Sequence, residues 1–320
     1  MCPDSTTDRE IRILFLGGAK RVSIARKFID AGTRLGRKVS IFSYELSREV
    51  PIASLGQVII GRRWSDPDLL ADLHSHIKRL GIDIILPFVD PAIEVAGRYA
   101  RTYNDAWAPT VSPDLAETLF DKAAAAQLYV SHRIPVPGTF TPDTPQFPLI
   151  AKPRRGSASK GITIINNSDE LERLTAPDQY LIEKYIARRE EYTVDAYITR
   201  SGSIICVSPR LRVEVLGGEV TRSVTVDDPA LTRLATSIIT SLRLIGPVTL
   251  QFIRDLTDST LMLMEINPRL GGGVVCSVHA GADIPRYILE EYLGITSQPL
   301  ITVKPGIMIC RYFDETVFNV

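Results

Sequence analysis

Short apolar runs alternate with helical patterns over the first third of the chain, and this alternation restricts the fold more than any other sequence feature. The mainly apolar run Ile11–Leu16 is followed by Gly17, Gly18 and then apolar residues at helical spacing, and similar patterns recur over 38–103. Strands and helices that alternate in this way form a parallel sheet with crossover helices. We therefore expect a parallel α/β domain over residues 1–110, ending at a proline-punctuated connection.

The pattern changes after this connection. We expect one helix over 114–132, followed by an extended proline-rich loop. Short strands and single helices fill the rest of the chain: strands over 148–152, 162–165, 180–183, 192–199, 203–207, 248–254 and 261–266, and helices over 229–243 and 285–292. This order predicts a second region over 111–320, of α+β class with mainly antiparallel strands.

Composition excludes several classes of function. The 37 Lys and Arg residues balance the 37 Asp and Glu residues, which argues against a broad nucleic-acid-binding surface. No apolar stretch approaches the roughly 20 residues that a membrane helix needs, and the N-terminus does not resemble a secretory signal. The cysteines Cys2, Cys206, Cys276 and Cys310 form no Cys-x-x-Cys pair. We expect reduced thiols in a cytoplasmic protein without nucleic-acid or membrane partners.

The most informative segment is the apolar run 261–269. Alternate side chains of a strand share a face, so Glu265 and Asn267 point the same way at its end, and Arg269 continues the alternation. A carboxylate and an amide oxygen suit Mg²⁺, and an arginine could grip a phosphate. Gln251, on the neighbouring expected strand, could supply a third oxygen. The alternative is a solvated strand end with incidental polar residues.

Two further segments carry groups that suit a nucleotide. A strand ends at Lys152 and opens into a loop of small residues up to Gly161, whose N–H groups could approach phosphate oxygens. It is not a Walker loop, and the alternative is a mobile basic hairpin. Over 180–195, two strands flank an acidic excursion that could meet adenine and ribose, and the alternative is a charged, solvated hairpin.

Taken together, these motifs resemble the ATP-grasp superfamily in their order: Lys122, Lys152 with its loop, Glu183-Lys-Tyr-Ile186, Glu190, Gln251 and Glu265-Ile-Asn-Pro-Arg269. The resemblance covers about residues 112–295 and is closest to the synthetase halves of the carbamoyl phosphate synthetase large chain. It implies a Rossmann-like pre-ATP-grasp domain before a two-lobed ATP-grasp domain. The nucleotide-lid lobe would span about 125–185 and the metal-carrying lobe about 186–320.

The resemblance also implies a role for each residue of these motifs. The groups that would contact the ATP phosphates are Lys122, Lys152, Arg154, Arg155, Gly156, Ser157, Ser159 and Gly161. Those that would hold adenine are Glu183 and the backbone of Lys184, Tyr185 and Ile186, with Glu190 or Glu191 on the ribose. Mg²⁺ or Mn²⁺ would be carried by Gln251, Glu265 and Asn267. The phosphorylated intermediate would be stabilised by Arg269, Arg210 and Arg212.

The chemistry implied is attack of a substrate carboxylate on the γ-phosphate, giving an acyl phosphate that an amine or similar nucleophile captures. Such transfer depends on positioning and charge neutralisation, without a protein nucleophile. Two departures from carbamoyl phosphate synthetase matter. The chain has one grasp region and no glutaminase-like segment, and Gly272 stands where the large-chain halves carry a further arginine. The first departure makes the chain too short for a complete carbamoyl phosphate synthetase. The second disfavours bicarbonate and favours a ligase that joins a bulkier carboxylic acid to an amine. A homodimer is compatible with this function.

Two other functions compete with this one. A nicotinamide-dependent oxidoreductase would use the Gly17-Gly18 turn, which lacks the third glycine of the dinucleotide fingerprint and has only Glu45 as a ribose acid. A non-catalytic, nucleotide-binding regulatory module would be favoured if Glu265 or Asn267 were missing, and both are present.

Three features outside the motifs stay open. The turn that ends at Lys20-Arg21 could face the cleft and touch substrate. Asp90, just after an expected parallel strand, could meet a substrate amine or cap the next helix. His279 follows the glycine run and could enter the substrate pocket or be solvated.

Overall fold

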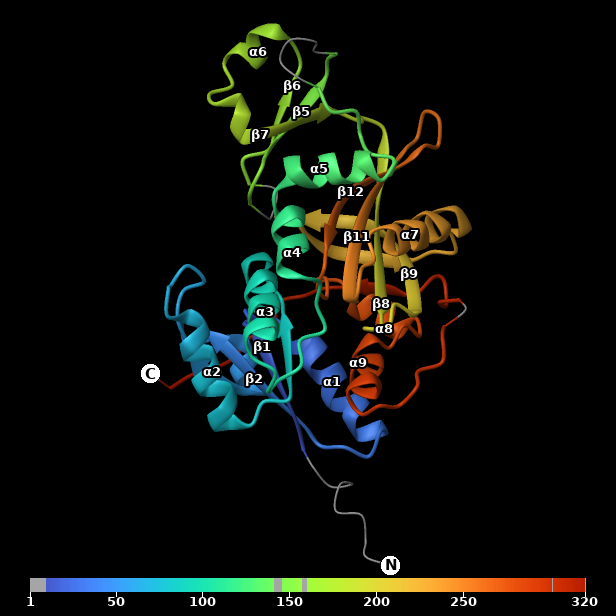
Figure 1. Cartoon of the computed structure of the whole chain (residues 1–320). Coiled ribbons are helices and arrows are strands. Elements are labelled where there is room, and N and C mark those ends of the chain that lie inside the picture. Colours follow the sequence, from blue (N-terminus) through green and yellow to red (C-terminus); the bar gives the residue numbers. More distant parts are fainter. Residues whose placement is uncertain (1–9, 141–145, 157–159, 301, 320) are drawn as a thin grey trace, which may run out of the picture.

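The computed structural model describes residues 10–140, 146–156, 160–300 and 302–319. Within these residues the strands form three sheets that follow one another along the molecule: a four-stranded sheet at one end, a six-stranded sheet in the middle and a three-stranded sheet at the other end (Figure 1). The arrangement confirms the expected fold class, an α/β domain followed by a two-lobed region with antiparallel sheets.

The N-terminal sheet is parallel throughout, in the order β3-β2-β1-β4. Its elements are β1 (Ile11–Leu16), α1 (Val22–Arg34), β2 (Val39–Glu45), a 3-10 turn (Pro51–Ser54), β3 (Gln57–Ile60), α2 (Leu69–Leu80), β4 (Ile84–Pro87) and α3 (Asp90–Thr102). The sequence pattern predicts all of these except the 3-10 turn and β3. Of the four β3 residues only Ile59 is buried, so the strand lacks the apolar run that marks the others.

The helix expected over 114–132 is wrong as a single element. It is two helices, α4 (Pro113–Phe120) and α5 (Lys122–Ser131), separated by Asp121 in an extended conformation. The Asp121 carboxylate accepts hydrogen bonds from the backbone N–H groups of Ala123 and Ala124, at 3.0 and 3.3 Å, and so caps the second helix. The break makes Lys122 the first residue of α5.

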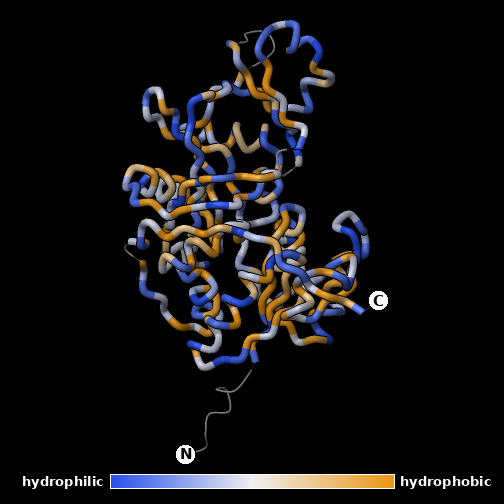
Figure 2. Tube along the Cα trace, turned by 180° about the vertical axis from the view of Figure 1, so that it is seen from behind, coloured by the Kyte–Doolittle hydropathy of each residue, from blue (hydrophilic) through white to orange (hydrophobic). Residues whose placement is uncertain are grey.

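The small sheet has the antiparallel order β6-β5-β7, and we call it the lid sheet. It is built from β5 (Leu149–Pro153), β6 (Thr163–Ile165), α6 (Ser168–Glu172), a 3-10 turn (Pro177–Gln179) and β7 (Tyr180–Lys184). Its own core is small, with Leu149, Ala151, Ile165 and Ile182 as the buried residues. Seen from behind, hydrophilic residues dominate the outer end of this part of the molecule (Figure 2).

The central sheet is antiparallel, in the order β12-β11-β8-β9-β10-β13. Its elements are β8 (Arg189–Ile198), β9 (Ile204–Leu216), β10 (Glu219–Thr225), α7 (Pro229–Ser241), β11 (Gly246–Asp255), β12 (Leu261–Asn267) and β13 (Met308–Cys310). Helix α7 packs with α4 and α5 on one face, around Leu231, Phe252 and Leu263. Strand β9 runs beyond its expected end, and the sequence pattern does not predict β10 or β13.

The chain returns to the N-terminal domain through α8 (Val275–His279) and α9 (Ile284–Tyr292). Phe15 and Phe28 share one buried core with Tyr197, Leu270 and Ile288, so the two regions are packed together. The boundary near residue 110 and the lobe limits remain predictions. Across the described ranges, none of the helices combines the length and apolar character needed to cross a bilayer.

Candidate active site

A cavity of about 760 Å³ lies between the three sheets. The N-terminal domain contributes the segment after β4, and the lid sheet contributes residues from all three of its strands. The central sheet contributes polar side chains from β8, β9, β11 and β12. Segments far apart in the sequence therefore meet around one space, as expected for a site between two lobes.

The strand register explains why polar residues gather on one face of the central sheet. Glu265 lies opposite Gln251, Gln251 opposite Thr193, and Thr193 opposite Arg210. Because every second residue of a strand shares a face, this row and the next one, which contains Asn267 and Thr249, face the cavity. The opposite face packs against α7.

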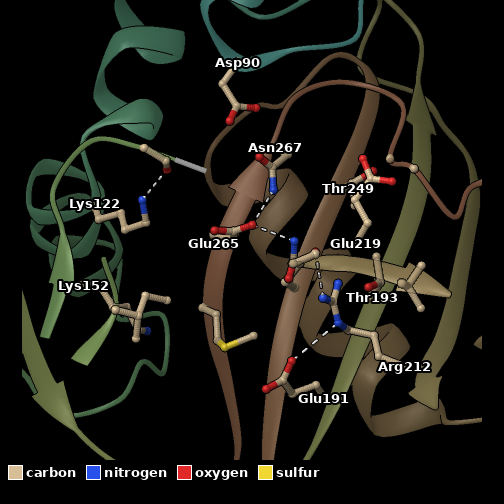
Figure 3. Close-up of a pocket in the computed structure, with 18 of the residues that line it drawn as sticks. Asp90, Lys122, Lys152, Glu191, Thr193, Arg212, Glu219, Thr249, Glu265 and Asn267 are labelled. Atoms are coloured by element: carbon tan, nitrogen blue, oxygen red, sulfur yellow. Dashed lines mark hydrogen bonds and ion pairs between the residues drawn. The ribbon is translucent and has the colours of Figure 1, made fainter. Parts of the chain in front are cut away.

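Glu265 is the centre of this polar group (Figure 3). Its Oε1 accepts hydrogen bonds from Gln251 Nε2 at 2.6 Å and from Asn267 Nδ2 at 2.8 Å. Strand alternation predicts Glu265 and Asn267 on one face, with Gln251 beside them on the neighbouring strand, and the three side chains lie in this way. A shift in the ladder beside Gln251 turns both Met264 and Glu265 toward the cavity, although neighbouring strand residues normally face opposite ways.

Two lysines lie across the cavity from Glu265 (Figure 3). Lys122 Nζ donates to the Gly156 carbonyl at 2.8 Å, which ties the start of α5 to the end of β5. Lys152 Nζ lies 2.5 Å from Glu183 Oε2, and the Glu183 side chain is only 4% exposed. The cavity thus has two cations on one wall and a carboxylate between two amides on the other.

Arg212 and Glu191 face the cavity beside this group. The Arg212 side chain is 8% exposed, and its nearest carboxylate oxygen, on Glu191, is 3.5 Å away. Arg212 Nε and Thr193 Oγ1 are buried and have no hydrogen-bond partner among the described residues. Burial lowers the pKa of the Arg212 guanidinium, with the nearby Arg210 charge as a further cause. An anion at this point would supply the missing acceptor.

The hinge between the lid and central sheets forms another wall. Lys184, Tyr185 and Ile186 line the cavity. The N–H groups of Lys184 and Tyr185 donate to the carbonyls of Gly138 and Pro148, at 2.8 and 3.0 Å, whereas no acceptor among the described residues is found for the Ile186 N–H. Apolar side chains flank this edge: Ile150, Ile162, Ile164, Ile253 and Met264. A flat, apolar ring with a polar edge fits such a slot.

Arg210 is held beneath the cavity floor by a buried polar network. Its Nε donates to Asp195 Oδ2 at 2.8 Å and its Nη1 to Ser223 Oγ at 3.2 Å. Asp195 also accepts from Ser277 Oγ at 2.7 Å and from Thr249 Oγ1 at 3.2 Å. Arg210 and Asp195 are 2% and 0% exposed. Arg210 lines the cavity, but its hydrogen bonds to Asp195 and Ser223 hold its guanidinium in place, which indicates a structural role.

Arg269 joins the end of β12 to the N-terminal domain, with its Nε and Nη2 both 2.8 Å from Asp90 Oδ1. Two roles are open for Asp90 from the sequence, and the structure does not support the one as a helix cap. Asp90 is the first residue inside α3, Val89 takes the capping position, and there is no capping hydrogen bond from a side chain. Arg21 also lines the cavity, so the turn before α1 does face it.

Glu219, at the start of β10, also lines the cavity, and Arg311, after β13, lies 2.8 Å from its carboxylate. Neither residue is predicted from the sequence. Their places depend on pairings between distant segments. The only local sign for Glu219 is the preceding Gly217-Gly218 turn, which marks a hairpin.

Several residues expected at the site lie elsewhere. The Arg154 guanidinium pairs with Asp121, and Arg155 lies near Glu117 and Phe120. Glu190 accepts from the Tyr192 hydroxyl on the face turned away from Glu191. The described residues that line the cavity include Gly156 and Lys160 but not Arg154, Arg155, Gly161, Glu183, Glu190 or His279. Ser157 and Ser159 lie outside the described residues.

The oxidoreductase alternative finds no support in the position of its ribose acid. Glu45 accepts from Ser43 Oγ at 2.6 Å and from the backbone of Gly18 and Ala19. Burial raises the pKa of this carboxyl. Its hydrogen bonds thus hold the glycine turn, and Glu45 is not among the described residues that line the cavity.

The residues on the Glu265 wall fit a hard divalent cation. Within the described ranges, no three His, Cys, Asp or Glu side chains are grouped closely enough to hold a metal ion by themselves. The oxygens available are those of the Glu265 carboxylate and, after rotation of their amides, of Gln251 and Asn267. Mg²⁺ and Mn²⁺ prefer such oxygens and share their shell with phosphates.

Solved structures with a similar fold are numerous. Biotin carboxylase from Campylobacter jejuni, in complex with β-γ-ATP, is 18% identical with a TM-score of 0.75, over 93% of this chain and 74% of that one. N5-carboxyaminoimidazole synthetase from Staphylococcus aureus, complexed with ADP, is 18% identical with a TM-score of 0.71, over 95% and 81% of the two chains. An L-amino acid ligase from Bacillus licheniformis is 17% identical, with a TM-score of 0.69, over 90% and 75%.

Residues 177–312 match the sequence model of a family described as "ATP-grasp in the biosynthetic pathway with Ter operon". The chain has the ATP-grasp fold. No curated protein matches the sequence. The ATP-grasp resemblance drawn from the sequence is therefore confirmed for the fold, while the particular likeness to carbamoyl phosphate synthetase stays a prediction. The matched range contains the central-sheet wall of the ATP-grasp cavity, including Glu191, Gln251 and Glu265.

Proposed function

We propose that this ATP-grasp protein is an ATP- and Mg²⁺-dependent ligase that activates a carboxylate as an acyl phosphate for capture by an amine. The observation that carries the proposal is the Glu265 carboxylate between Gln251 and Asn267, facing Lys122 and Lys152 across the cavity. Phosphoryl transfer needs cations on the phosphate oxygens and a site for a divalent ion. The wall with the two lysines supplies the cations, and the wall with Glu265 supplies the ion site.

ATP would lie along the cavity between the lid and central sheets. The Ile186 N–H would meet the adenine edge, and Glu191 would accept from the ribose hydroxyls. Lys122, Lys152 and Arg212 would bind phosphate oxygens. Gln251, Glu265 and Asn267 would hold Mg²⁺ or Mn²⁺, which neutralises phosphate charge when bound.

In the proposed reaction a substrate carboxylate oxygen attacks the γ-phosphorus, and the bond from that phosphorus to the β,γ-bridging oxygen breaks, releasing ADP. The amine nitrogen then attacks the acyl carbon and phosphate leaves, while the amine loses a proton. Arg269, positioned by Asp90, would bind the transferring phosphoryl group. No protein nucleophile is required, because the side chains bind, orient and neutralise charge.

The test is ADP release by the purified protein with MgATP and a panel of small carboxylates, each with and without an amino acid. Hydroxylamine replaces the amine in a parallel series, because it converts an acyl phosphate into a stable hydroxamate. We expect release that needs a carboxylate, with hydroxamate as the trapped product. Tight MgATP binding without turnover on any pair would instead support the regulatory module, and reduction of a nicotinamide would support the oxidoreductase.

We propose the cytoplasm as the compartment, because Cys206, Cys276 and Cys310 are free thiols. A homodimer is also proposed, with support only from a related fold: the biotin carboxylase domain of Hydrogenobacter thermophilus 2-oxoglutarate carboxylase, 17% identical, is described as a dimer. Light scattering on the purified protein would give the mass of the particle and decide between monomer and dimer.

A further inference from the structure

Two arginines from separate parts of the chain, Arg21 and Arg311, meet beside Gly272, and the charge of a third, Arg269, also acts on Arg21. Arg21 precedes α1, Arg269 follows β12 and Arg311 follows β13. A Cβ added to Gly272 would lie 3.1 Å from Arg21 Nη1 and 3.8 Å from Arg311 Nη1. The Gly272 backbone is therefore the floor beneath two guanidinium groups, and it borders the cavity.

Arg21 is the least satisfied of the three. Its side chain is 16% exposed, and the nearest carboxylate oxygen, on Glu219, is 3.7 Å away. Arg269 and Arg311 each have a carboxylate oxygen at 2.8 Å. Burial is the main cause that lowers the pKa of the Arg21 guanidinium, and the charges of Arg269 and Arg311 lower it further. A largely buried cation whose nearest carboxylate oxygen is 3.7 Å away favours a further anionic ligand.

The local charge leaves room for one more anion. The three arginines face two carboxylates, Asp90 and Glu219. Asp90 is taken by Arg269, and Glu219 is shared between Arg311 and Arg21. Half of the Glu219 side chain is exposed, and it follows a turn of two glycines with positive φ. This half-exposed carboxylate is therefore the counter-ion that Arg21 and Arg311 share.

The absence of a side chain at Gly272 also supports an anion site. Its backbone does not adopt the left-handed conformation that favours glycine, so its missing side chain matters for space. Any larger residue would press on the Arg21 guanidinium.

We propose that Arg21 and Arg311, above Gly272, bind a second anionic group of the acyl substrate. This inference rests on the proposed ligase function. The reacting carboxylate has to reach the phosphate bound near Arg269 and Glu265, whereas Arg21 and Arg311 flank Gly272, so we assign the group above Gly272 to a different part of the substrate. The acyl substrate is then a carboxylic acid that carries another carboxylate or a phosphate-type group at its far end.

The experiment is calorimetric titration of the full chain, saturated with MgADP, with linear dicarboxylates from malonate to adipate. Each is compared with the monocarboxylate of equal length. We expect the best diacid to bind wild type at least tenfold more tightly than its monoacid, and R21Q to lose about ten- to one-hundredfold of that affinity, because a charge-assisted pair is removed. R21K should recover part of the loss. R26Q, which changes an exposed arginine within α1, should bind as wild type does.

A second variant, G272A, tests the site without removing a charge. Its methyl group should displace the Arg21 guanidinium and weaken the diacid, while MgADP binding and the melting temperature stay close to wild type. Replacing one carboxylate of the best diacid by a phosphonate identifies the preferred group, and tighter binding of either form supports the subsite.

Two failures are distinguishable. If wild type does not bind MgADP, the proposed function fails. If MgADP binds but diacids bind no better than monoacids, or R21Q binds the best diacid as tightly as wild type, the second-anion subsite is refuted and the ligase proposal stands.

Discussion

Arg269 and Asp90 are 179 residues apart in the sequence, yet two nitrogens of the guanidinium lie 2.8 Å from one carboxylate oxygen. The pair links the end of β12, which carries Glu265 and Asn267, to the start of α3 in the N-terminal domain. The N-terminal domain thus helps to build the site by fixing an arginine that the central sheet supplies.

Neutralising Asp90 should misplace Arg269 without emptying the nucleotide site. We expect D90N to lower the rate of ADP release about ten- to one-hundredfold, because positioning errors near a transferring group are costly. The affinity for MgADP, measured by calorimetry, should change less than about twofold. The matched control is E94Q on the same helix, where Glu94 makes only a 3.7 Å contact with Arg98. Equal loss of MgADP affinity and rate in D90N would argue that the pair merely holds the fold together.

Glu190 and Glu191 are neighbours on β8, but only Glu191 lies among the cavity-lining residues described. We expect E191Q to weaken ATP binding about tenfold, since a hydrogen bond to a charged acceptor is lost. E190Q should leave the affinity within about twofold, because its partner is Tyr192 on the other face. Binding of a fluorescent ATP analogue measures both, and the reverse order of the two effects would contradict the proposed ribose contact.

We expect the buried Asp195–Arg210 ion pair to contribute to the stability of the fold. Both side chains are buried, so D195A leaves a charged guanidinium without its partner. We expect the free energy of unfolding in urea to fall by about 3–5 kcal/mol. The double variant D195L/R210M, which removes both charges, should recover much of the loss. A double variant as unstable as D195A would show that the charge pair is not the cause.

We expect Glu10 to make the stability of the fold depend on pH. Hydrogen bonds from Lys38 and Ser40 are the main causes that hold the pKa of its carboxyl at about 2, below the ordinary 4.5. A folded-state pKa below the unfolded one adds stability above pH 4.5, and this contribution is lost as the pH falls from 4.5 towards 2. We expect E10Q to melt below wild type at pH 7 and close to it at pH 2.5. A difference in melting temperature that does not shrink on acidification would contradict this.

The sequence pattern predicts those features of the fold and the site that depend on residues close together in the chain. Alternation along 261–269 places Glu265 and Asn267 on one face, as the structure does, because a strand has a fixed period of two. The break at Asp121 escapes the prediction because helix propensity in the alanine run masks it, although an Asp before a helix is a capping residue.

Contacts between distant segments could not be predicted in this way. Arg21, Glu219 and Arg311 meet through the packing of three separate regions, and no spacing rule relates their positions. The same holds for Arg154, which the ATP-grasp resemblance places on phosphates but which Asp121 binds instead. Glu191 faces the cavity because the register of β8 with β11 fixes its side, and sequence alone leaves Glu190 and Glu191 both open.

The central claim is that Glu265 carries a divalent ion beside a bound nucleotide, and one measurement tests it directly. Calorimetric titration compares ADP with Mg²⁺ and ADP with a chelator, for wild type and for E265Q, which keeps the shape of the side chain. We expect Mg²⁺ to strengthen ADP binding at least about tenfold in wild type and to have little effect in E265Q. An equal Mg²⁺ effect in both proteins, or no ADP binding by wild type, would contradict the claim.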